Sequence, residues 1–95
     1  MKKKVCIIGL GYIGLPTAAF IANKGISVSG IDINDEIVSN INKGKIHIAE
    51  KGLASLVKSV ILSGKLKAFN KVQLSDIYMI CVPTPFHIHK NNDLP

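Results

Sequence analysis

Residues 4–32 read KVCIIGLGYIGLPTAAFIANKGISVSGID, and this stretch admits two incompatible interpretations. Behind consecutive lysines, residues 5–22 carry no charge, as in a secretory signal peptide or a short membrane anchor. Within them, residues 9–14 read GLGYIG, which has the G-x-G-x-x-G spacing of a dinucleotide-binding loop. The two interpretations require different backbone conformations in the middle of the stretch.

The glycines and Pro16 decide against a continuous helix. A signal or membrane-spanning segment must be helical, because lipid offers its peptide groups no hydrogen-bond partners. Each glycine weakens a helix by about 1 kcal/mol, and proline weakens it more. Residues 5–8 therefore predict a short strand that is apolar on both faces, as in a parallel sheet. Residues 15–24 predict a helix, with Pro16 in its first turn and Gly25 as its C-terminal cap. An exported or membrane-anchored peptide is the alternative.

A second strand ends in the acidic residue that this kind of fold requires. The apolar residues Ile26, Val28 and Ile31 lead into Asp32, which lies close to the expected position about 20 residues beyond the glycines. We expect Asp32 to accept hydrogen bonds from the adenosine ribose and to repel a 2′-phosphate, which favours NAD over NADP. All 12 basic residues are lysines, so no arginine is present to clamp that phosphate. The alternative is that Asp32 caps a helix or ends its strand in solvent.

Each glycine of the loop has a separate predicted task. Gly9 allows the tight turn, Gly11 lets the main chain approach the pyrophosphate, and Gly14 lets helix and strand pack closely. The helix N-terminus behind them offers free N–H groups and about half a positive charge to the phosphates.

The rest of the chain continues to alternate between helix and strand. Apolar spacing, caps and glycines predict helices at 34–44 and 51–64, a short strand at 65–69, and a longer apolar strand at 76–83. Pro83 and Pro85 end the last strand in a loop at the carboxyl edge, where open α/β sheets bind ligands. The predicted fold is a Rossmann-like, doubly wound parallel α/β sheet, the first and incomplete half, with strand order 3-2-1-4. Cys6 and Cys81 then lie on neighbouring strands without a disulfide.

Composition excludes several other classes. The 95 residues allow one domain, and the formal charge of +6 comes from scattered lysines with few aromatic residues, which argues against a nucleic-acid partner. His87-x-His89 has no further metal ligand at suitable spacing, so we expect a polar loop and no metal. Without an export signal the cysteines are expected to be reduced, as in a cytoplasmic protein with no membrane partner.

Several motifs together resemble the N-terminal domain of the UDP-glucose/GDP-mannose dehydrogenase family. They are GLGYIGLPTAAFIA, GIDIN, NINKGKIHIAEKGLASLV, GKLKA and CVPTPF, in that order, and they cover essentially the whole chain. Within the family, HIAE at residues 47–50 resembles the branch that acts on UDP-N-acetyl-D-mannosamine. The alternatives are enzymes acting on UDP-glucose or UDP-N-acetylglucosamine.

The resemblance implies an enzyme that oxidises the C6 hydroxymethyl of a UDP-sugar to a carboxylate with two NAD, in surface polysaccharide biosynthesis. In the family, the nucleophilic cysteine and its assisting lysine lie well downstream, and neither Cys6 nor Cys81 matches that motif. No catalytic residue is therefore expected in residues 1–95. The implied cofactor-binding residues are Gly9, Gly11, Tyr12, Ile13, Gly14, Asp32, Pro83 and Thr84.

The ending KNNDLP stops where relatives continue into the next helix. Residues 1–95 are thus expected to be an N-terminal NAD-binding domain, truncated, without the middle and C-terminal sugar-binding domains. Alone it is expected to be inactive, and the full-length enzyme is expected to be a homo-oligomer. A separate NAD-binding module without chemistry is the alternative.

Overall fold

The computed structural model describes residues 3–82 of the chain. Its elements, in order, are β1 (Lys4–Ile8), α1 (Gly14–Asn23), β2 (Ser27–Ile31), α2 (Asp35–Asn42), α3 (Leu53–Leu62), β3 (Leu66–Phe69) and β4 (Ile77–Ile80). This alternation matches the pattern predicted from the sequence. Pro83 and Pro85 and the loop predicted around them lie outside the described residues, as does His87-x-His89.

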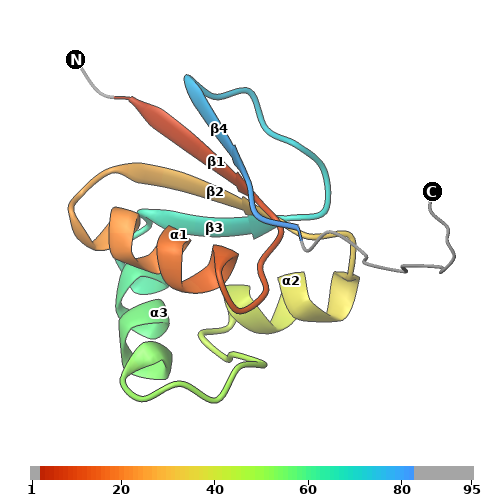
Figure 1. Ribbon diagram of the computed structural model, residues 1–95. Coiled ribbons are helices and arrows are strands. Elements are labelled where there is room, and N and C mark those ends of the chain that lie inside the picture. The colour runs from red at the N-terminus through yellow and green to blue at the C-terminus, as the bar shows by residue number, and fades with distance from the viewer. Residues whose placement is uncertain (1–2, 83–95) are drawn as a thin grey trace, which may run out of the picture.

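The strands form one parallel sheet in the order β3-β2-β1-β4, which confirms the predicted order and the α/β fold class. All strands point the same way, so their carboxyl ends meet at one edge, on the right in Figure 1. β1 lies between β2 and β4, and its Val5, Cys6 and Ile7 are buried, as expected for an apolar strand inside a parallel sheet.

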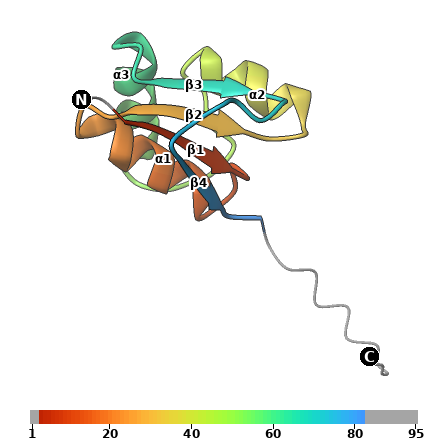
Figure 2. The same cartoon turned by 90° about the horizontal axis from the view of Figure 1, so that it is seen from above.

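The three helices of residues 3–82 cover one side of the sheet, below it in the view of Figure 1 and behind it in Figure 2, which is seen from above. Both crossovers, β1 to β2 and β2 to β3, proceed in the same direction across the sheet, and right-handed connections then place their helices on the same face. The main core lies between these two layers. It is formed by side chains that alternate along the strands and by apolar stripes of the helices, including Ile7, Val28, Leu66, Leu15, Ala18, Ala22, Ile41, Val57 and Val60.

The helix ends follow their sequence signals. The side chain of Asn34 caps α2 by accepting hydrogen bonds from the N–H groups of Glu36 at 2.9 Å and Ile37 at 3.2 Å. The Gly25 N–H donates to Ala22 O at 2.9 Å after the end of α1, and its φ of 90° lies in the left-handed region that glycine favours.

The last strand differs from its sequence-based description. β4 spans four residues, the same length as β3, and it was expected to be the longer of the two. Its pairing with β1 does extend one residue beyond each end, because Asp76 N donates to Lys4 O at 2.9 Å and Cys81 N donates to Ile8 O at 2.7 Å. The sequence-based estimate was too long because it included every residue of the apolar run. The strand itself is limited to the four residues that pair with β1.

Both cysteines are free, as expected. Cys6 is buried in β1, in register with Tyr78 of the neighbouring β4, and Cys81 directly follows β4 and so lies just outside the strand on which it was predicted.

Candidate functional site

The loop after β1 begins at Gly9, at the carboxyl edge of the sheet. Gly9 has a φ of 100°, and its N–H donates to Ile31 O at 2.7 Å, which holds the loop against the end of β2. A Cβ on Gly9 would lie 2.9 Å from Val82 Cγ1. Both the positive φ and this crowding require glycine here.

Gly11 and Gly14 differ in how much space surrounds them. A Cβ on Gly14 would overlap the carbonyl oxygen of Gly9, so α1 can pack this closely only because residue 14 is glycine. A Cβ on Gly11 would meet nothing within 4 Å, and the φ of Gly11 lies outside the left-handed region. Nothing in the fold itself therefore excludes a side chain at Gly11, and the space beside it is open to a ligand.

The same loop presents backbone donors to that space. Among residues 3–82, no hydrogen-bond acceptor is assigned to the N–H groups of Gly11, Tyr12 or Ile13, which precede the first residue of α1. Tyr12 and Ile13 are 75% and 70% exposed, so this part of the loop lies at the protein surface. Free N–H groups at a helix N-terminus suit a phosphate.

Asp32 follows β2 and connects two loops. Its Oδ2 accepts a hydrogen bond from Leu10 N at 3.1 Å, and its Oδ1 accepts one from Asn34 N at 2.9 Å. The carboxylate is half-buried and each oxygen retains a lone pair for a ligand hydroxyl. Asn34, not Asp32, caps α2, so the alternative of Asp32 as the helix cap is wrong.

A hollow of about 420 Å³ lies between the glycine loop and the end of β4. It is lined by Gly11, Tyr12, Ile13, Ile80, Cys81 and Val82. The hollow thus extends from the open side of Gly11 to the residues that lead out of β4, in the place where parallel α/β sheets bind ligands.

The structure brings together five of the predicted loop residues and places Asp32 beside them. The five loop residues are Gly9, Gly11, Tyr12, Ile13 and Gly14. Pro83 and Thr84 lie outside the described residues, and the binding roles of all eight stay predictions.

Sequence reasoning missed the contact between Leu10 and Gly30, where a Cβ on Gly30 would lie 2.9 Å from Leu10 Cδ2. An isolated glycine inside a strand pattern was the available signal for such a close approach.

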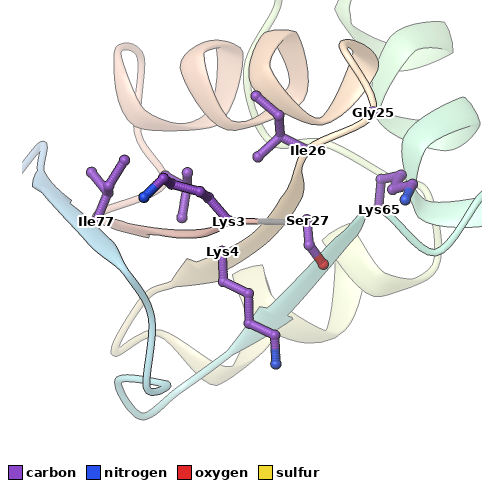
Figure 3. A pocket seen from close by; sticks show the side chains of 8 residues that line it. Lys3, Lys4, Gly25, Ile26, Ser27, Lys65 and Ile77 are labelled. Carbon is purple, nitrogen blue, oxygen red and sulfur yellow. The ribbon is translucent and has the colours of Figure 1, made fainter. Parts of the chain in front are cut away.

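A second hollow, about 560 Å³, lies at the opposite edge of the sheet and is shown in Figure 3. It is lined by Lys3, Lys4, Val5, Gly25, Ile26, Ser27, Lys65 and Ile77. This edge carries the amino ends of the strands and no part of the glycine loop. Size alone therefore does not identify the site, and the smaller hollow at the carboxyl edge is the one beside loop N–H groups that have no acceptor among residues 3–82.

Within residues 3–82, no cluster of three His, Cys, Asp or Glu side chains could hold a metal ion. Over the same range, no helix combines the length and apolar character needed to cross a membrane.

Residues 3–95 match the NAD binding domain of the UDP-glucose/GDP-mannose dehydrogenase family. The chain belongs to this family. The resemblance seen in the sequence motifs is thereby confirmed, and the family's NAD binding domain implies NAD as the cofactor. The open space at Gly11, the loop N–H groups that lack an acceptor among residues 3–82, and the Asp32 carboxylate fit such a ligand.

Two curated relatives share the same enzyme name. The chain is 59% identical over 83 residues to a UDP-N-acetyl-D-mannosamine dehydrogenase of Campylobacter jejuni, covering 87% of this chain and 20% of the relative. It is 49% identical over 83 residues to the enzyme of that name from Methanocaldococcus jannaschii, covering 87% of this chain and 19% of the relative. The chain thus spans about a fifth of the length of the curated relatives it matches.

Solved structures agree in fold. The native structure of a UDP-N-acetyl-mannosamine dehydrogenase from Staphylococcus aureus superposes with a TM-score of 0.85 at 42% identity, covering 95% of this chain and 21% of that one. A ternary complex of GDP-mannose dehydrogenase from Pseudomonas aeruginosa gives a TM-score of 0.85 at 36% identity, covering 96% and 21%.

Proposed function

We propose that residues 1–95 are the N-terminal NAD-binding part of a cytoplasmic UDP-N-acetyl-D-mannosamine dehydrogenase. The whole enzyme oxidises the C6 hydroxymethyl of the UDP-sugar to a carboxylate in surface polysaccharide biosynthesis. It acts as a homo-oligomer without nucleic-acid or membrane partners. Bound NAD supplies the hydride acceptor. The other substrates considered are UDP-glucose and UDP-N-acetylglucosamine, and the other class is an NAD-binding module without chemistry.

The residues of this chain divide the work of binding. The N–H groups of Gly11, Tyr12 and Ile13 would bind the pyrophosphate, and Asp32 would bind the adenosine ribose. Gly9 and Gly14 keep the loop compact against β4 and α1, and Pro83 and Thr84 are assigned to the cofactor's surroundings by family resemblance. The observation that carries the proposal is the open space beside Gly11, next to N–H groups that have no acceptor among residues 3–82.

Calorimetric titration of the chain with NAD and NADP tests the site. We expect NAD to bind at least about tenfold more tightly, because a fixed Asp32 carboxylate repels a 2′-phosphate. Gly11→Val should lose NAD binding by filling the phosphate space. Because a Cβ at Gly11 meets nothing within 4 Å, this variant should keep the urea midpoint of the parent chain. Equal affinities for the two cofactors would contradict the role of Asp32, and unchanged binding by Gly11→Val would contradict the phosphate loop.

A chimera tests the activity. This chain replaces the corresponding segment of the Campylobacter jejuni relative, and NADH production is followed with UDP-N-acetyl-D-mannosamine and UDP-glucose. We expect turnover of the first sugar by the chimera, none by its Gly11→Val version, and none by the 95-residue chain alone. A chimera that is folded and binds NAD yet oxidises neither sugar would favour the module without chemistry.

A further inference from the structure

The glycine loop contributes one side chain to the buried core. Among residues 9–13, only the Leu10 side chain belongs to the core between the sheet and the helices, and Leu10 is 1% exposed. Tyr12 and Ile13 of the same loop are exposed. Leu10 directly precedes Gly11, the first loop residue whose N–H has no acceptor among residues 3–82. The position of Leu10 therefore determines where the proposed phosphate-binding backbone starts.

The Leu10 side chain lies against the backbone of β2 at Gly30. The three atoms nearest to a Cβ on Gly30 would all belong to Leu10, at 2.9 Å for Cδ2, 3.1 Å for Cδ1 and 3.6 Å for Cγ. Carbon atoms in contact are normally about 3.5–4.0 Å apart, so both methyl groups would be too close. Rotating the end of the side chain exchanges one methyl group for the other and does not clear the space. The φ of Gly30 lies outside the left-handed region, so Leu10, and not the backbone conformation, requires glycine here.

Two hydrogen bonds join the loop backbone to β2 beside this contact. Gly9 N donates to Ile31 O at 2.7 Å, and Leu10 N donates to Asp32 Oδ2 at 3.1 Å. The loop is thus attached to three consecutive residues, to Gly30 by packing and to the next two by hydrogen bonds. Protein cores are densely packed, so a buried side chain displaced from Gly30 has little free space to enter. Its displacement would move the loop backbone and strain these hydrogen bonds.

We propose that Leu10 is a positioning residue for the cofactor site and that Gly30 provides the space in which it is held. The inference rests on the proposed NAD site. The N–H groups of Gly11, Tyr12 and Ile13 can bind one pyrophosphate together only when the loop keeps a single conformation, and Leu10 packed on Gly30 maintains it. Neither residue needs to contact the cofactor, because a loop already held in its binding conformation loses less entropy when the ligand binds.

The test titrates NAD into the parent chain and its variants by calorimetry. Gly30→Ala should raise the dissociation constant by about tenfold, because the added methyl group displaces Leu10 and the loop with it. The double variant Gly30→Ala/Leu10→Val adds one carbon and removes one, so the side-chain volume is conserved. It should bind NAD within about threefold of the parent chain, and a loss caused only by weaker folding would not be recovered in this way.

Val28→Ile is the matched control. It also adds one carbon to a buried position of β2, two residues before Gly30 and further from the carboxyl edge. It should lower the urea midpoint by overpacking the core, while the dissociation constant for NAD stays within about twofold of the parent value. The amide resonances of Gly11, Tyr12 and Ile13 should shift in Gly30→Ala, return toward the parent positions in the double variant, and stay unchanged in Val28→Ile.

The outcomes separate this proposal from the one on which it rests. If the parent chain does not bind NAD, the NAD site fails and this inference fails with it. If the parent binds and Gly30→Ala binds equally well with unchanged loop resonances, the role of Leu10 is overturned while the site stands. A folded double variant that binds no better than Gly30→Ala would overturn it as well.

If Gly30→Ala does not fold, Leu10→Val by itself decides. This variant keeps Gly30 and leaves the space of one carbon beside it, so the loop is held less firmly. The dissociation constant for NAD should rise by about threefold, and the Gly9 and Leu10 amides, which bond to β2, should exchange faster. Parent values for both measurements would overturn the proposal.

Discussion

The two edges of the sheet are finished in different ways. At the β3 edge, the side chain of Asn42 from the end of α2 accepts from Ala68 N at 2.8 Å and donates to Ala68 O at 2.9 Å. This amide occupies the outward groups of Ala68 as a neighbouring strand would. At the other edge, β4 has only β1 beside it among the described residues, and all four of its residues are exposed, Ile80 by 72%.

The two edges differ in whether the chain itself supplies hydrogen-bond partners for outward backbone groups. An open edge with apolar side chains is a template for another strand, whereas an edge that is closed by a side chain is not. At the β3 edge, the outward backbone groups of Ala68 are paired within the chain. The β4 edge is suited to a further strand, from a longer chain or from a second copy, and it is also the edge next to the glycine loop.

The largest expected effect comes from opening the closed edge. Asn42→Ala removes both hydrogen bonds to Ala68 and leaves two part-buried backbone groups unpaired, which should lower the free energy of unfolding by about 2 kcal/mol. Urea denaturation followed by circular dichroism measures it. Asn23→Ala, at an exposed position in the last turn of α1, is the control and should cost less than about 0.5 kcal/mol. Equal losses in both variants would mean that Asn42 does not close the edge.

A second experiment blocks the open edge. The 95-residue chain by itself should self-associate, and Ile80→Lys should weaken that association by about tenfold, because a charge on an edge strand opposes pairing. Sedimentation velocity over a concentration series measures the change. Leu74→Lys adds the same charge at a more exposed position outside β4, so a comparable weakening there would show that net charge, not the edge, controls association.

The smallest effect is expected where β4 begins. Asp76 Oδ2 accepts a hydrogen bond from Lys4 N at 2.8 Å, and Asp76 N donates one to Lys4 O. This exposed residue therefore joins the start of β4 to the start of β1. Asp76→Ala should lower the free energy of unfolding by about 0.5 kcal/mol, since exposed hydrogen bonds contribute little net stability. Amide exchange at Lys4 should speed up in this variant and less so in Asp76→Asn, which keeps an acceptor. An unchanged Lys4 exchange rate would argue against a stabilising hydrogen bond between Lys4 N and the Asp76 side chain.

Much of the fold could be predicted because its signals are local. Glycine spacing, the residues around Asn34 and Gly25, and apolar periodicity determine where elements begin and end. The strand order followed from the resemblance to a doubly wound sheet.

The contacts that complete the fold and the site could not be predicted, because they join residues far apart in the sequence. The bonds of Asn42 to Ala68 and of Asp32 to Leu10 connect positions 26 and 22 residues apart, and each depends on how a helix or loop lies over a strand. A pattern of residue types carries no such distances.

The pairing of β1 with β4 also has a consequence for the order of folding. Lys4 and Asp76 are 72 residues apart, so this ladder closes a long loop, and non-local parallel pairing is intrinsically slow. During synthesis, β1, β2 and β3 leave the ribosome before β4. Until β4 arrives, the buried residues Val5, Cys6 and Ile7 lie in a strand with one unpaired side. The nascent chain is therefore most exposed to misassociation in the interval between the completion of β3 and the arrival of β4.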